Sequence, residues 1–145
     1  MTYNPINRGV PTISRAASRL TANNSGVLIA KATPVRVTST GLALIDVSVE
    51  SQVNGVAGLT NDAVSNASQG EVISGGLIED ITTSAAVGEP VYISKTGVIT
   101  NIKPSVGSGG FVSGDWAIRV GVIAKNNNNP LLKDILVNIQ IVGQL

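Results

Sequence analysis

Two stretches of the sequence repeat one β-hairpin signature. Residues 33–44 read TPVRVTSTGLAL, and residues 88–100 read GEPVYISKTGVIT. In each stretch a proline precedes alternating apolar and polar residues, and a glycine closes the turn. Because proline cannot donate to a β-ladder and glycine readily adopts positive φ, these residues mark a strand start and a tight turn. The repeated signature predicts a β fold.

The match between the two stretches extends along the chain when one insertion is allowed. Residues 34–43 align with 90–99 at an offset of 56, and Gly58 aligns with Gly121 at an offset of 63. The seven-residue difference falls in the stretch KPSVGSGGFVSGD of the second copy. Chance similarity among short strings rich in valine and glycine is the alternative, but a single consistent shift favours duplication.

The predicted product is an all-β fold, a small β-barrel or sandwich built from two similar halves, 34–80 and 90–142. Glycine inside an apolar strand is typical of a bulge or a bend, which we expect at Gly58 and Gly121. Alternation with a period of two residues indicates half-buried strands. The strands it predicts are 27–32, 34–40, 42–50, 90–94, 116–124 and 134–142, and the helical patterns are 13–20 and 61–67.

Basic charge is concentrated at the N-terminus. The first 45 residues contain five basic side chains and no acidic one, whereas the remainder carries nine acids and five bases. We interpret residues 1–30 as an extended basic arm and residues 31–145 as a single domain. We expect the arm to dock on an acidic partner or neighbouring subunit through Arg8, Arg15 and Arg19. A disordered tail and an organelle transit peptide are the alternatives.

The sequence contains neither cysteine nor histidine. This composition excludes disulfides, ordinary zinc sites and every catalytic triad that needs a histidine. No apolar run is long enough to span a membrane, and the first residues lack the apolar segment of a secretory signal. Four scattered aromatic residues form no base-stacking surface. We therefore predict no enzymatic activity, no cofactor, no metal, and no nucleic-acid or membrane partner.

The remaining polar features have simple structural interpretations. Glu79 and Asp80 are adjacent, so in a strand they point to opposite faces and form no catalytic dyad. The glycine-rich stretches 74–76 and 107–110 lack the lysine and the strand–helix setting of a phosphate loop. Lys95 lies at a hairpin tip, as the lipoylated lysine of carrier domains does, but a solvated turn lysine is the simpler interpretation. The run NNNNP has no acid within it and is interpreted as a solvated loop rather than a cation site.

The composition also bears on assembly. Charged residues make up 13% of the sequence, against about 25% in a typical domain. A hydrophobic fraction of 43% then leaves a monomer short of polar surface. Because large exposed apolar patches usually mark interfaces, we expect a closed homo-oligomer.

Several of these stretches resemble small virion proteins of tailed bacteriophages, in particular the capsid decoration or cement proteins. The stretches are VGEPVYISKTGVITNIKPSVG, GDWAIRVGVIAKN and DILVNIQIVGQL. Members carry a hairpin of the form G-x-x-V-Y-h-s-x-x-G-h-h-T, in which h is apolar, followed by an h-G-h-h strand. The earlier VNGVAGLTNDAVSNASQGEVI is similar to their G-h-A-x-x-D-A-x-x-G-x-x-h segment. The resemblance covers roughly residues 34–145.

The resemblance implies a non-enzymatic structural protein on the outside of a phage head, made in the host cytoplasm. Such proteins assemble, often as trimers, at three-fold and quasi-three-fold positions and bridge neighbouring major capsid proteins. They have no catalytic residues, and they stabilise the mature shell because they bind only that state. Similar strings occur in tail-fibre, head-fibre and baseplate proteins, so an adaptor of that kind is the alternative. A lipoyl-like carrier module is a second alternative.

Overall fold

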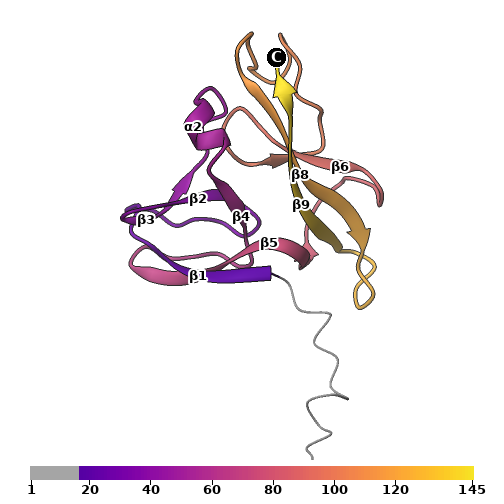
Figure 1. Cartoon of the computed structure of the whole chain (residues 1–145). Coiled ribbons are helices and arrows are strands. Elements are labelled where there is room, and N and C mark those ends of the chain that lie inside the picture. Colours follow the sequence, from indigo (N-terminus) through magenta and orange to yellow (C-terminus); the bar gives the residue numbers. More distant parts are fainter. Residues whose placement is uncertain (1–16) are drawn as a thin grey trace, which may run out of the picture.

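The computed structural model describes residues 17–145, which form one antiparallel sheet of nine strands curled into a half-barrel (Figure 1). The predicted all-β fold is thus confirmed. Predictions that fall on residues 1–16, including Arg8 and Arg15, lie outside the described residues. The elements are β1 (Ala17–Asn23), β2 (Pro34–Thr38), β3 (Gly41–Leu44), α2 (Glu50–Val53), β4 (Val56–Thr60), β5 (Ser68–Ile81), β6 (Pro90–Ile93), β7 (Ile99–Thr100), β8 (Trp116–Lys125) and β9 (Lys133–Gln144).

The strand order repeats itself in the two parts of the chain. The first part follows the order β3-β2-β4-β5 and the second the order β7-β6-β8-β9, and β5 pairs with β9 where the two parts meet. The registers also repeat. Val35 lies opposite Gly58 and Val91 lies opposite Gly121, and a β-bulge follows each of these pairs. The equivalent pairs are separated by the same offsets, 56 and 63, that align the two stretches in the sequence.

A pseudo-two-fold axis runs through the centre of the sheet. Gly75 pairs with Asn138, which lies 63 residues later. The two paired residues therefore occupy equivalent positions in the two repeats. On one side of this pair, β5 continues to pair with β9 as far as Ile81 and Lys133. On the other side, β5 pairs with β1 instead. The symmetry of the central pair of strands is thus complete on one side only.

The two equivalent glycines allow neighbouring strands to approach each other closely. A Cβ atom on Gly58 would overlap the carbonyl oxygen of Ile73, and one on Gly121 would overlap the carbonyl oxygen of Leu136. Gly58 also has a φ of +155°, which disfavours any residue with a side chain. The predicted bulges next to Gly58 and Gly121 are confirmed, and at both positions the glycine also allows a close backbone contact with the next strand.

Two hydrophobic cores are separated by the first half of the sheet. The larger core combines residues of both halves, among them Leu59 and Ile73 from the first and Ile118 from the second. The smaller core lies within the first half and consists of Ile29, Val35, Leu42 and Val72. Strand β1 closes this smaller unit, since it pairs with β5 along its length and lies close to β3.

Strand β1 corrects two predictions. Residues 17–20, predicted as part of a helix, are extended, because pairing with β5 satisfies backbone groups that a two-turn helix could not stabilise alone. The arm assigned to 1–30 is also wrong from residue 17 onward. The chain there forms β1 and contributes the buried Ile29 to the smaller core.

The other differences lie in loops. The strand predicted at 42–50 ends at Leu44, because the side chain of Asp46 accepts hydrogen bonds from the N–H and hydroxyl of Ser48 and turns the chain. Residues 27–32 contribute a single bridge, Ile29 to Val64, rather than a strand. The same bridge holds residues 61–67 in a loop, where a helix was expected. The strands predicted around Pro34, Pro90, 116–124 and 134–142 are confirmed.

Candidate functional site

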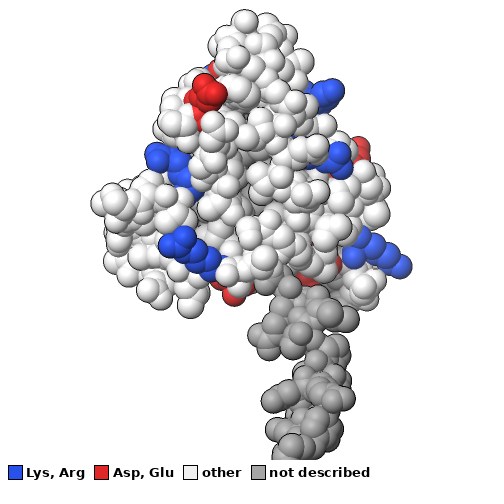
Figure 2. Space-filling model, in the orientation of Figure 1, with Lys and Arg blue, Asp and Glu red and all other residues white. Residues whose placement is uncertain are grey.

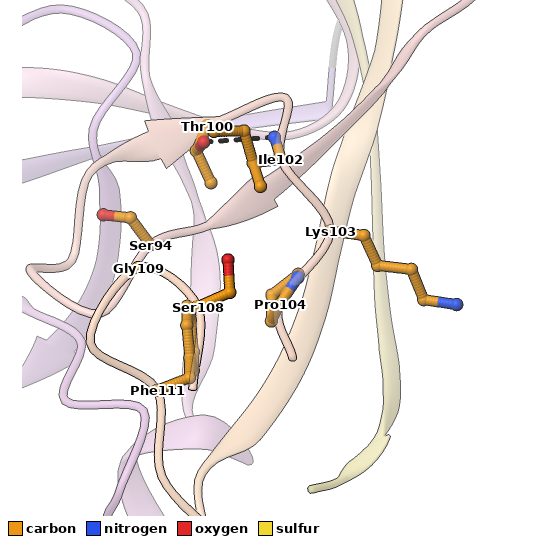
Figure 3. Close-up of a pocket in the computed structure, with 8 residues that line it drawn as sticks. All are labelled: Ser94, Thr100, Ile102, Lys103, Pro104, Ser108, Gly109 and Phe111. Carbon is orange, nitrogen blue, oxygen red and sulfur yellow. Dashed lines mark hydrogen bonds between the residues drawn. The ribbon is translucent and has the colours of Figure 1, made fainter. Parts of the chain in front are cut away.

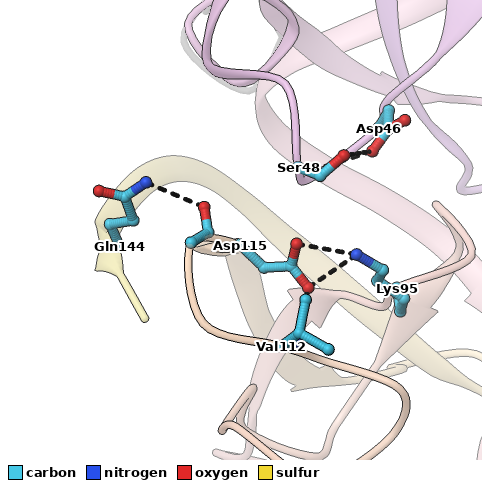
Figure 4. A network of polar contacts seen from close by, with 7 residues as sticks. Asp46, Ser48, Lys95, Val112, Asp115 and Gln144 are labelled. Atoms are coloured by element: carbon cyan, nitrogen blue, oxygen red, sulfur yellow. Dashed lines mark hydrogen bonds and ion pairs between the residues drawn. The ribbon is translucent and has the colours of Figure 1, made fainter.

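An ion pair between Lys95 and Asp115 joins the tip of the β6–β7 hairpin to the loop before β8 (Figure 4). The Lys95 ammonium donates to both carboxylate oxygens of Asp115, with Nζ–Oδ distances of 2.8 and 2.7 Å. The Asp115 side chain is only 2% exposed, and the Lys95 side chain is 30% exposed. The expectation that Lys95 is simply solvated is therefore wrong.

Asp115 is held by more than its ion pair. The Val112 N–H donates to Asp115 Oδ2 at 2.9 Å, and the backbone of Asp115 accepts a hydrogen bond from the Leu145 N–H at 2.8 Å. The hydrogen bond from Lys95 is the main reason that the pKa of Asp115 is lowered from its ordinary value of 3.8. An ammonium engaged in this way is a poor acyl acceptor, so the geometry favours a structural role for Lys95 over a carrier role.

Asp46 lies near this ion pair but belongs to the first half of the sheet. Its carboxylate accepts from the hydroxyl of Ser48 at 2.6 Å and from the Ser48 N–H at 2.9 Å. These bonds lower the pKa of Asp46, and the Lys95 charge adds a smaller effect in the same direction. The two carboxylates thus stay ionised and share no proton, which makes a general acid–base pair unsuitable here.

A small cavity opens between the β6–β7 hairpin and the inserted loop (Figure 3). Its volume is about 90 Å³, well below the roughly 300 Å³ of a typical ligand site. The residues lining it are Ser94, Thr100, Ile102, Lys103, Pro104, Ser108, Gly109 and Phe111. Lys103 is the only charged residue among them, and its side chain points away from the others (Figure 3). The cavity therefore lacks convergent groups for catalysis.

A larger opening of about 340 Å³ lies at the end of the smaller core. Apolar side chains of Val37, Ala57 and Val72 line it together with Ser18, Ser74, Ala17 and Arg19. Arg19 is exposed on β1 opposite Val72, so its guanidinium is available to a partner. The structure thus places one of the three predicted partner-binding arginines on the surface, and the other two lie outside the described residues.

A buried polar cluster connects β5, β8 and β9 at the other end of the sheet. The Asn126 amide donates to Asp80 Oδ1 at 2.7 Å and to Asp134 Oδ1 at 2.8 Å. Asn126 also accepts from the N–H groups of Asn128 and Asn129, so it orders the NNNNP loop. Sequence reasoning treated this run as solvated, but Asn126 is only 5% exposed. The sequence carries no local signal for this burial, because the partners Asp80 and Asp134 lie on other strands.

Neither the adjacent acids Glu79 and Asp80 nor the cluster around Asn126 forms a metal or catalytic centre. Asp80 is bonded to Asn126 rather than to Glu79, so the two adjacent acids do not act as a pair. Within residues 17–145, no group of three or more His, Cys, Asp and Glu side chains could hold a metal ion. These polar groups order loops and strand ends.

The molecular surface is the remaining candidate for a functional site. Charged side chains are few and scattered on the face shown in Figure 2, with wide uncharged areas between them. Exposed aliphatic side chains contribute to this surface. They include Leu20, Val27, Leu28, Ile102, Leu131, Leu136, Ile141 and Val142. Such a surface is suited to contact with another macromolecule.

Compared with known proteins, the chain matches no family model and no curated sequence. In the described part of the chain, no helix is long and apolar enough to cross a membrane.

Proposed function

We propose that the chain is a non-enzymatic virion structural protein, a capsid decoration or cement protein that binds the outer surface of a phage head. The observation that carries this proposal is the sparsely charged surface with many exposed aliphatic side chains. The polar networks around Asp115 and Asn126 support it, because both are used to order loops. The partner is the major capsid protein, and the protein acts as a homo-oligomer.

The mechanism is selective binding. A protein that binds the expanded shell and not its dissociated subunits stabilises the shell by its binding free energy. Many weakly bound copies then act together, because each copy that bridges two capsid subunits raises the local concentration of the next contact. Arg8, Arg15 and Arg19 pair with capsid carboxylates, and this pairing fixes orientation and weakens at high salt.

The test is co-sedimentation of the purified protein with expanded heads that lack decoration, followed by thermal disruption of the heads. We expect saturable binding and a higher disruption temperature. A variant with Arg8, Arg15 and Arg19 replaced by glutamate should bind more weakly, whereas Lys103→Glu, at an exposed lysine of the inserted loop, serves as the matched control. Binding to tails or baseplates but not to heads would replace this function with the adaptor alternative.

A further inference from the structure

Strand β9 has an open edge in its C-terminal half. Residues 133–138 lie between β8 and β5, but residues 139–144 pair with β8 alone. No described strand pairs with their other edge. In Figure 1 this end of β9 leads to the C-terminus at the top of the view. Backbone groups on such an edge are available to another strand.

The pseudo-two-fold symmetry explains why this edge is open. Under the 63-residue offset, the C-terminal half of β9 corresponds to the C-terminal half of β5, which pairs with β9. A fully symmetric sheet would pair residues 139–144 with the N-terminal half of β5. Residues 139–144 therefore lack the partner that a symmetric sheet would give them, because β1 pairs with that half of β5 instead.

The sequence at this edge lacks two of the features that usually prevent strands from associating, charge and proline. Residues 139–144 read IQIVGQ, with no charge and no proline. Ile141 is 40% exposed and Val142 is 50% exposed, so apolar side chains are accessible here. Two irregularities interrupt the pairing with β8, one at Val142 and one between Val137 and Gln140, and these are the protective feature that the edge retains. The other outer strands differ, because β3 lies close to β1 and β7 has only two residues.

We propose that residues 139–144 of β9 pair antiparallel with the same residues of a second copy, around a two-fold axis near Ile141. This inference goes beyond the proposed function and does not rest on it, because a two-fold contact differs from the trimers that the resemblance implies. The contact joins the sheets of two protomers into one continuous sheet.

A second copy is the occupant that fits this edge. The fold already pairs equivalent strands antiparallel about the axis at Gly75 and Asn138, so the proposed contact repeats an arrangement that the backbone adopts within the chain. An edge without charge brings no like charges together when it meets itself. Six residues span only about 20 Å, so the contact also needs neighbouring surface.

The test is the mass of the purified full-length protein in solution, measured by light scattering over a micromolar concentration range. We expect twice the chain mass of 14.8 kDa. Ile141→Lys places two ammonium groups next to each other across the axis and should raise the dimer Kd about 100-fold. Leu136→Lys is the matched control, because Leu136 is 47% exposed on the part of β9 that has a strand on each side.

A mixture of Ile141→Lys and Ile141→Glu proteins should recover dimers, which separates loss of the contact from loss of folding. A monomer at all concentrations, a trimer, or equal weakening by Leu136→Lys would overturn the edge pairing. None of these results depends on capsid binding. A monomeric protein that still binds heads would remove this inference and leave the proposed function in place.

Discussion

The ion pair between Lys95 and Asp115 offers the most direct test of the structure. Lys95→Met removes the ammonium and keeps the apolar stem of the side chain. Asp115, which is almost fully buried, then keeps only the Val112 N–H as a donor to its carboxylate. Lys103→Met is the matched control, because this lysine is exposed in the loop before β8 and makes no ion pair with any described residue.

The magnitude follows from the burial of the two partners. Hydrogen bonds to charged groups contribute about 1.5–3 kcal/mol, and Lys95 is 30% exposed, so water replaces part of the lost interaction. We expect a loss of about 2 kcal/mol in the free energy of unfolding at pH 7. For a chain of this size that corresponds to a fall of about 4–8 °C in Tm, measured by calorimetry. The control should change stability by less than about 0.5 kcal/mol.

The pH dependence gives an independent check. Lys95 lowers the pKa of Asp115 below the ordinary value of 3.8, so the ionised carboxylate is favoured in the folded state. This contribution to stability is complete above pH 3.8 and is lost as the pH falls through the lowered pKa. The difference in Tm between the wild-type protein and Lys95→Met should therefore shrink in acid. Equal Tm values at pH 7, or a difference that persists unchanged in acid, would refute the reasoning.

Three further changes test other parts of the fold. Gly58→Ala should cost about 3 kcal/mol in urea denaturation, because its Cβ meets the neighbouring strand, whereas the Cβ of Gly75→Ala would lie in ordinary contact with Ala17 Cβ at 3.9 Å, so this change should be tolerated. Thr21→Val should raise Tm by a few degrees, since the Thr21 hydroxyl is buried without a hydrogen-bond partner among residues 17–145. Asn126→Ala should cost about 2 kcal/mol and increase amide hydrogen exchange in the following loop, because it removes the donor to Asp134 and the acceptor that orders that loop. An unchanged stability in the first or third case, or a lower Tm in the second, would contradict the corresponding contact.

Local patterns predicted five of the nine strands at least in part, β2, β3, β6, β8 and β9, but not β1, β4, β5 or β7. Pro34 and Pro90 begin strands because proline fixes φ and has no N–H, and Gly58 and Gly121 lie next to bulges because glycine accepts backbone conformations that other residues avoid. Loops were harder to predict. The chain leaves its strand after Leu44 because Asp46 forms local hydrogen bonds, and such side-chain turns compete with a strand without changing the apolar pattern.

Contacts between distant residues account for the errors at the candidate sites. Lys95 and Asp115 are 20 residues apart, and no spacing rule connects a hairpin tip to the end of an inserted loop. Asn126 likewise contacts Asp80 across the sheet. The apparent helix at 13–20 shows the same limit, since its described part is extended only because β5 offers it a complementary edge.

Strand β5 has a consequence for how the protein folds. Its first half completes the unit that contains the smaller core, and its second half pairs with β9. Neither duplicated half can therefore close without the same 14-residue segment. Although the chain is built from two copies of one pattern, it should unfold as a single cooperative unit. An isolated copy should remain unfolded, so any cut within β5 should abolish both halves together.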